Sequence, residues 1–138
     1  MKKQINQVKE FHEAFGVQNN MSPTNLNFDE LHLRAKLLDE ENQEYIEAAM
    51  ENDLVEVADA LGDQLYIVLG TILRHGLQDM ILPIFNEIQR SNMSKLDANG
   101  NPVINGVNGE DPRKPMGKIL KSDLYSEPDI KKILAKWL

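Results

Sequence analysis

Acidic side chains are concentrated in two neighbouring stretches of the sequence. One carries the run Glu40-Glu41-Asn42-Gln43-Glu44, and the other carries Glu56, Asp59 and Asp63. Like charges three or four residues apart on a helix lie about 5–6 Å from one another and repel. A divalent cation would remove this repulsion, and a ligand set made only of oxygen favours Mg²⁺ first and Mn²⁺ second. The sequence therefore predicts a Mg²⁺ site and, with it, a substrate that carries phosphate.

A run of charges is more often a solvated helix face than a metal site. The angular positions favour the metal site here, because a turn of about 100° per residue puts the acids in the same sectors as apolar residues. The apolar residues that share these sectors are Leu37, Tyr45 and Ala48 on the first stretch and Ala60, Ile67 and Gly70 on the second. Burying unpaired carboxylates is costly or forces them to protonate. We therefore expect the acids to lie on the packing side of both helices, neutralised by a metal ion.

The hairpin geometry selects among the acids. In a hairpin that turns near Asn52, a rise of about 1.5 Å per residue brings Asp59 and Asp63 level with Glu44 and Glu41. Glu56 falls nearer the turn, where it could instead take part in the helix start. Glu40 flanks the cluster and is predicted to position or deprotonate an attacking water. The predicted metal ligands are therefore Glu41, Glu44, Asp59 and Asp63, with Glu56 left open.

Hydrophobic periodicity predicts an all-α protein with four main helices. They are expected over residues 5–15, 27–50, 54–75 and 78–89, and the third, which is apolar nearly all round, is expected to be the buried one. Residues 96–118 are rich in Gly, Asn and Pro and predict an ordered flap or a mobile loop. A last short helix is expected to start near Ser126, Pro128 and Asp129. We expect residues 1–138 to form one domain with a four-helix bundle core.

Composition excludes several classes of function. The net charge is −7, which argues against a nucleic-acid partner. The chain has no cysteine and only three histidines, so a thiolate site or a zinc cluster is not expected. We expect no membrane contact, since no apolar run is long enough to be a signal peptide or a span, and a cytoplasmic location.

Several blocks of sequence resemble the MazG and phosphoribosyl-ATP pyrophosphohydrolase superfamily of all-α nucleotide pyrophosphatases, in its phage and bacterial MazG-like branch. The blocks are the Glu-Glu-x-x-Glu run at residues 40–44, FHEAFG at 11–16, DALGDQLYIVLG at 59–70, RSNMSK at 90–95 and GKILKSDLYSEPDI at 117–130. The resemblance implies hydrolysis of a nucleoside triphosphate or related nucleotide between the α and β phosphates, Mg²⁺ as cofactor, and a homodimer or homotetramer.

The chain departs from the family pattern on the second helix, where the family usually has Glu-x-x-Asp. The only literal match, Glu56 to Asp59, follows Glu44 closely. Aligning Asp63 with the family's aspartate instead puts Ala60 where the glutamate belongs, so that Asp59 would have to substitute for it.

Candidate substrate-binding residues lie mainly near the Gly-rich segment. Lysines that frame it could close over the phosphates of a nucleotide, although surface lysines are ordinarily solvated. A polar contact from Asn92 and contacts to the base from Tyr125 or His12 complete the predicted set, although a lone histidine on an apolar helix face is more often a core-edge residue. The predicted substrate-binding residues are Asn92, Lys95, Lys118, Lys121, Tyr125 and His12.

Two other classes of function compete with the pyrophosphohydrolase. A non-catalytic helical module, binding a nucleotide or a partner protein, would use the acids only as a solubilising edge and would not respond to Mg²⁺. A di-iron four-helix protein would need Glu-x-x-His on its helices. No Glu-x-x-His occurs in the sequence, which leaves the first alternative open.

Overall fold

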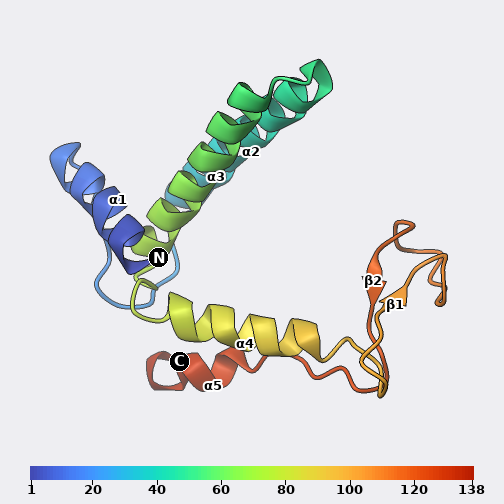
Figure 1. Cartoon of the computed structure of the whole chain (residues 1–138). Coiled ribbons are helices and arrows are strands. Elements are labelled where there is room, and N and C mark those ends of the chain that lie inside the picture. The colour runs from blue at the N-terminus through green and yellow to red at the C-terminus, as the bar shows by residue number, and fades with distance from the viewer. The chain divides into compact units, whose positions relative to one another are not determined.

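The computed structural model describes all residues, 1–138, and divides them into two compact units, Met1–Asp79 and Met80–Leu138 (Figure 1). The first unit contains α1 (Lys2–Ala14), α2 (Phe28–Glu51) and α3 (Leu54–Arg74). The second contains α4 (Ile81–Met93), strands β1 (Val103–Ile104) and β2 (Ile119–Leu120), α5 (Ile130–Leu134) and the 3₁₀ turn η1 (Ala135–Trp137). The predicted all-α class is confirmed, whereas the expectation of a single domain stays a prediction. None of the helices combines the length and hydropathy that a membrane span requires.

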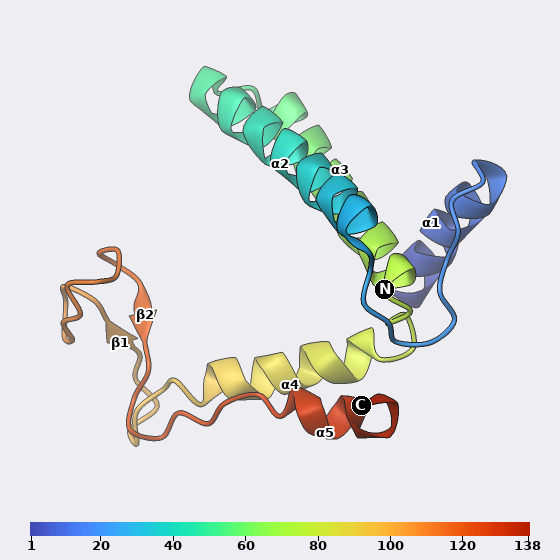
Figure 2. The same ribbon diagram turned by 180° about the vertical axis from the view of Figure 1, so that it is seen from behind.

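The first unit is built around an antiparallel hairpin of α2 and α3, which lie side by side in both views (Figures 1 and 2). Asn27 begins α2, and its side chain accepts a hydrogen bond from the backbone N–H of Glu30. Asp53 begins α3 by accepting from Val55 and Glu56 in the same way. Asn52, at φ 57°, makes the left-handed turn between the two helices. Both predicted starts are confirmed, because side-chain oxygens satisfy the free N–H groups of each first turn.

α1 packs against α3 and buries Ile5 and Val8. The polar loop 17–27 that follows α1 is ordered because its backbone and side chains cap the end of α3. The Asn20 N–H donates to the carbonyl of Leu73 at 3.1 Å, and the Thr24 N–H donates to that of His75 at 3.0 Å. The loop thereby satisfies carbonyl groups that the end of a helix leaves without partners.

The expectation that α3 is the buried helix is wrong for this chain. It buries Ala60, Leu69, Gly70, Leu73 and Arg74, but its apolar side chains on another face are solvent-exposed, led by Leu54 at 79%. Periodicity reports how apolar a helix is, whereas burial depends on how many other elements cover it, and only α1 and α2 pack on α3.

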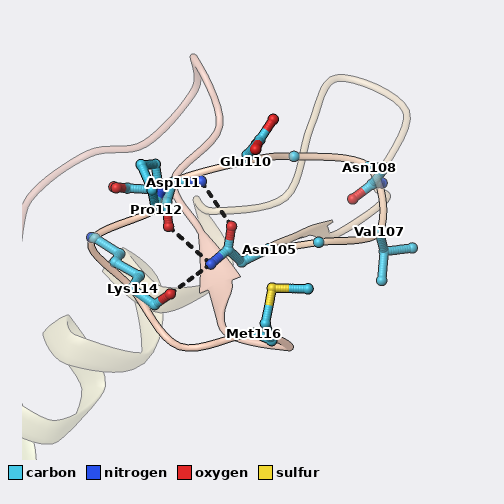
Figure 3. A pocket seen from close by; sticks show the side chains of 10 residues that line it. Asn105, Val107, Asn108, Glu110, Asp111, Pro112, Lys114 and Met116 are labelled. Carbon is cyan, nitrogen blue, oxygen red and sulfur yellow. Dashed lines mark hydrogen bonds between the residues drawn. The ribbon is translucent and has the colours of Figure 1, made fainter.

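In the second unit the Gly-rich segment is an ordered loop that includes a two-stranded antiparallel pair, β1 and β2, which the sequence did not predict. Asn105, only 3% exposed, holds this loop together. Its side-chain amide donates to the carbonyls of Asp111, Lys114 and Pro115, and its oxygen accepts the Asp111 N–H at 2.7 Å. Figure 3 shows the bonds with Asp111 and Lys114. Of the two alternatives for this segment, the ordered flap is therefore confirmed.

α5 begins at Ile130, directly after Asp129, whose side chain accepts from the Lys132 N–H. The predicted short helix is present, with Asp129 rather than Ser126 as the residue that caps it. The segment before it is tied to α4 through Glu87, which accepts the Asp129 N–H at 2.8 Å and two bonds from Arg90. Arg90 in turn donates to the carbonyl of Glu127. One carboxylate thus joins α4 to the start of the last helix.

Candidate functional site

The register of the α2–α3 hairpin decides which acids come level with one another. The Gln64 side-chain N–H donates to the backbone carbonyl of Glu41 at 3.3 Å, which places Asp63 level with Glu41. A pocket of about 220 Å³ lies nearer the turn and is lined by Glu44, Glu47, Ala48, Glu51, Glu56 and Asp59. Asp59 therefore lies level with Glu44, as the rise of about 1.5 Å per residue predicted. Glu56 lines the same pocket.

Glu41 is the acid that this hairpin partly buries. Its Oε2 atom is enclosed and has no hydrogen-bond partner. Burial raises the pKa of this carboxyl, and the negative charges of Glu44, Asp63, Asp59 and Glu40 raise it further, in that order. An enclosed carboxylate oxygen without a donor is costly, and here its charged neighbours are acids. The surroundings of Glu41 therefore favour the approach of a cation.

The other predicted ligands are exposed, which corrects the expectation that the acids lie on the packing side. Glu44, Glu56, Asp59 and Asp63 all face solvent, as does Glu40. No three acidic or histidine side chains converge closely enough to form a ready metal site. The donor set nevertheless fits Mg²⁺, because it consists of carboxylates level with one another around the unpaired oxygen of Glu41.

The profile of the phosphoribosyl-ATP pyrophosphohydrolase family matches residues 8–92, which include α2, α3 and both acidic stretches. The chain belongs to this family. Membership in the phosphoribosyl-ATP pyrophosphohydrolase family confirms the resemblance and assigns the chain to the pyrophosphohydrolases that act on nucleotides. Such enzymes generally use a divalent metal, which agrees with the oxygen donors of the hairpin. No curated protein matches the chain.

In the second unit, the structure brings some of the predicted substrate-binding residues together. Lys95 donates to the side chain of Asn92 at 2.8 Å, and the Lys121 ammonium lies 4.2 Å from the centre of the Tyr125 ring. Ser122 ties these two pairs to neighbouring segments, because its hydroxyl hydrogen-bonds with the carbonyls of Ser94 and Leu96. The blocks RSNMSK and GKILKSDLYSEPDI therefore meet in the folded chain.

Lys118 lies apart from this group. It is exposed, and its backbone carbonyl accepts the Asn105 N–H at 2.9 Å, so it belongs to the base of the ordered loop. Lys95, Lys118, Lys121 and Tyr125 also lie beyond the matched residues 8–92, whereas Asn92 lies at their end. The substrate-binding role of these residues stays a prediction.

His12 is 3% exposed and is hydrogen-bonded through Nδ1 to Asn19 at 2.6 Å. It lies beside Gly70, where a methyl group in place of the glycine hydrogen would come within 3.0 Å of His12 Nε2 and 2.7 Å of Arg34 Nη2. Contact between His12 and a base stays a prediction, and in this structure the ring is part of the packing between α1 and α3.

Two polar residues near the site were not singled out from the sequence. Gln64 sets the helix register through Glu41, and Arg34 donates to Thr71 at 2.9 Å and to the carbonyl of Ile67 at 2.6 Å. Arg34 precedes Glu41 by seven residues, which is two helical turns and hence the same face. That spacing was a signal that Arg34 also faces α3.

Proposed function

We propose that this protein hydrolyses a nucleoside triphosphate, or a related nucleotide such as phosphoribosyl-ATP, between its α and β phosphates in the presence of Mg²⁺. The observation that carries the proposal is the enclosed, unpaired Oε2 of Glu41 among four other acids. Family membership supports the pyrophosphohydrolase reaction itself. The products would be a nucleoside monophosphate and pyrophosphate.

Glu41, Glu44, Asp59 and Asp63 are proposed to hold the metal, with Glu56 as a further candidate because it lines the pocket beside Asp59. A bound Mg²⁺ would supply positive charge next to the phosphate oxygens and lower the pKa of a bound water. Mn²⁺ would serve as a substitute, because it accepts the same hard oxygen ligands.

Glu40 is proposed to take the proton from the attacking water. It is exposed on α2, beside Glu41, and can therefore be reached by solvent. In the proposed reaction the water oxygen bonds to the α phosphorus, the bond between this phosphorus and the α–β bridging oxygen breaks, and pyrophosphate leaves with the bonding electron pair. A glutamate side chain positioned at the attacking water is one of the groups that can serve as general base.

Lys95, Lys118 and Lys121 are proposed to neutralise phosphate oxygens, with Asn92 as a polar contact and Tyr125 or His12 against the base. The pairing of Lys95 with Asn92 supports this role, because the amide oxygen holds the ammonium in place without cancelling its charge. The homodimer or homotetramer implied by the resemblance is also retained as a proposal.

The test is a pyrophosphate-release screen of ribo- and deoxyribonucleoside triphosphates and phosphoribosyl-ATP, with Mg²⁺ and with EDTA. Glu41→Gln and Asp63→Asn are run beside the wild type, and Glu10→Gln on α1 is the matched control for loss of one exposed acid. We expect monophosphate and pyrophosphate only with Mg²⁺, loss in both site variants, and full activity in the control.

The alternative is a non-catalytic module that binds a nucleotide or a partner protein. Exposed apolar side chains on α2 and α3 favour an interaction surface of some kind. If a titration shows Mg²⁺-dependent nucleotide binding and the screen yields no product from any nucleotide, the protein is a nucleotide-binding module and not an enzyme. No response to Mg²⁺ at all would favour the interaction module.

A further inference from the structure

Three of the eight glycines of the chain directly follow an asparagine, and all three lie in the Gly-rich segment. The pairs are Asn99-Gly100, Asn105-Gly106 and Asn108-Gly109. In such a pair the backbone nitrogen of the glycine can attack the side-chain amide of the asparagine, because glycine has no Cβ to hinder the approach. Since the dipeptide is the same in all three places, the folded structure decides which asparagine reacts.

Asn105 is the most strongly held of the three asparagines. It is 3% exposed, and its amide points toward Asp111 and Lys114 inside the loop (Figure 3). The amide nitrogen donates to the carbonyls of Asp111, Lys114 and Pro115, and the amide oxygen accepts the Asp111 N–H. An attack on this amide by Gly106 would first have to break these bonds. Asn105 is therefore protected as long as the loop is folded.

Asn108 is exposed but is also held at both polar atoms of its amide. Its oxygen accepts the Ile104 N–H at 2.7 Å, and its nitrogen donates to the Pro102 carbonyl at 3.0 Å. Because the side chain has to turn toward the nitrogen of Gly109 to react, both bonds must break first. Exposure to solvent alone therefore does not make Asn108 reactive.

Asn99 is exposed, and its amide takes part in none of the hydrogen bonds that order this segment. Only its backbone N–H is held, by Oδ1 of Asp97 at 2.9 Å. Gly100, the residue that would attack, has φ 77° and open space around the position of a Cβ. The Asn99 side chain can therefore turn toward Gly100 without losing a hydrogen bond within the chain.

The glycine nitrogens themselves do not distinguish the three pairs. Each of their N–H groups donates to a backbone carbonyl of the segment. The acceptors are the carbonyls of Asp97 for Gly100 at 3.0 Å, Gly109 for Gly106 at 2.8 Å and Ile104 for Gly109 at 3.2 Å. The attacking nitrogen is thus restrained in every pair, and the difference in reactivity comes from the side chains of the asparagines.

We propose that Asn99 is a site of spontaneous deamidation, whereas Asn105 and Asn108 are protected by the folded loop. The nitrogen of Gly100 bonds to Cγ of Asn99, the bond from Cγ to Nδ2 breaks, and the proton of the Gly100 N–H leaves with Nδ2 as ammonia. Water then opens the cyclic imide at either of its carbonyls, which gives aspartate or isoaspartate. Water is the only co-reactant, and the proposal does not rest on the catalytic function.

Deamidation at this position changes the charge of a cavity. Asn99 lines a cavity of about 570 Å³ together with residues that include Asp97, Lys121 and Asp123. A new carboxylate at residue 99 is the third acid in this lining, beside the single cation Lys121. The isoaspartate product also lengthens the main chain within the turn that the Asp97 carboxylate holds. Deamidation therefore alters both the charge and the main chain of the segment next to Lys121.

The first experiment is peptide mass spectrometry of the full chain after incubation at mildly alkaline pH, with one sample folded and one in concentrated urea. In the folded sample we expect Asn99 to deamidate at least about tenfold faster than Asn108, which must first lose two hydrogen bonds. In urea the three asparagines should react at similar rates, because the same residue follows each of them. A folded sample in which Asn108 reacts as fast as Asn99 would overturn the proposal, as would an Asn99 that reacts only in urea.

A second measurement tests the assignment by charge. The folded wild type should form a more acidic species on ion-exchange chromatography, and Asn99→Gln should not, because the longer side chain closes its ring much more slowly. Asn101→Gln is the matched control, since Asn101 is also exposed but precedes Pro102, whose nitrogen has no proton to lose. This control should form the acidic species like the wild type. If Asn99→Gln forms it as fast as the wild type, the modification lies at another residue and the proposal fails.

Discussion

The side-chain amide of Gln64 on α3 donates a hydrogen bond to the backbone carbonyl of Glu41 on α2, 3.3 Å away. This bond joins the two helices at the level where the Glu41 carboxylate is enclosed with an unpaired oxygen. The Oε2 atom of that carboxylate has no hydrogen-bond donor within the chain. The hairpin thereby presents an acid that lacks a partner within the chain.

Replacing Glu41 with Gln tests the metal role of this acid. We expect activity to fall at least about 100-fold, since loss of even an outer-shell partner of a metal costs up to about that factor. The metal-free variant should unfold at the same or a higher temperature than the wild type, because the change removes a carboxylate that burial and like charges disfavour.

Thermal unfolding with and without Mg²⁺ separates these two effects. At an Mg²⁺ concentration of about 100 Kd, binding should stabilise the wild type by about 2.7 kcal/mol and leave the variant unchanged. Glu10→Gln is again the control. An equal rise of the midpoint in wild type and Glu41→Gln would show that Glu41 does not hold the metal.

Substituting alanine at two glycines of α3 should change the stability of the protein in opposite directions. At Gly62 an added Cβ meets nothing within 4 Å, so Gly62→Ala should gain up to about 1 kcal/mol from helix propensity. At Gly70 the Cβ would lie 2.7 Å from Arg34 Nη2, and Arg34 is held by Thr71 and Ile67. Gly70→Ala should therefore destabilise by about 1–3 kcal/mol. Urea unfolding of both variants checks the contrast, and a stabilised Gly70→Ala would contradict it.

The helix starts were predictable because they depend on local chemistry. Asn27 and Asp53 cap their helices with their own side chains, and Asp129 does the same before α5. The positions of Asp59 and Asp63 along the hairpin, level with Glu44 and Glu41, also followed from the rise per residue alone. Glu56 takes part in the helix start only through its backbone. Asp53 accepts the Glu56 N–H, whereas the Glu56 carboxylate lines the pocket.

Burial was not predictable, because it depends on which elements cover a face. Glu44, Asp59 and Asp63 share helical sectors with apolar residues and are nevertheless exposed. The strands β1 and β2 were missed because each has only two residues, too short for an alternating pattern to appear. Gln64 was missed because its partner is a backbone carbonyl on the facing helix, which leaves no mark in the sequence. Arg34 was missed although its spacing of seven residues from Glu41 places both on one face of α2.

Asn105 should be the residue on which the ordered loop depends. Asn105→Ala removes an amide that donates to the carbonyls of Asp111, Lys114 and Pro115 and leaves these groups to water. We expect local opening of residues 103–120 to become easier by about 1–3 kcal/mol while the helices keep their stability. Hydrogen exchange measured by peptide mass checks this, with Asn99→Ala as the control for loss of an exposed amide. Unchanged exchange in Asn105→Ala would show that the loop is held by other contacts.

Lowering the pH should weaken the attachment of the C-terminal segment to α4. The hydrogen bonds from Arg90 and then that from the Asp129 N–H lower the pKa of Glu87 from its ordinary 4.5 to about 2. A carboxyl whose pKa is lowered by folding contributes stability above its ordinary pKa and loses it as the pH falls through the folded value. We expect the segment from Glu127 to Trp137 to loosen between about pH 4.5 and pH 2.

Trp137 is the only tryptophan of the chain and lies at the end of this segment, so its fluorescence reports the change. Glu87→Gln keeps an oxygen that can accept the Asp129 N–H but loses the charge that Arg90 binds. Its fluorescence should therefore resemble that of the acid-loosened wild type already at neutral pH and should change less on acidification. Glu127→Gln, which alters a neighbouring exposed carboxylate, should follow the wild type. If Glu87→Gln and the wild type instead show the same transition, the acid response arises from another carboxyl, and the bonds between Glu87, Arg90 and Asp129 do not hold the segment in solution.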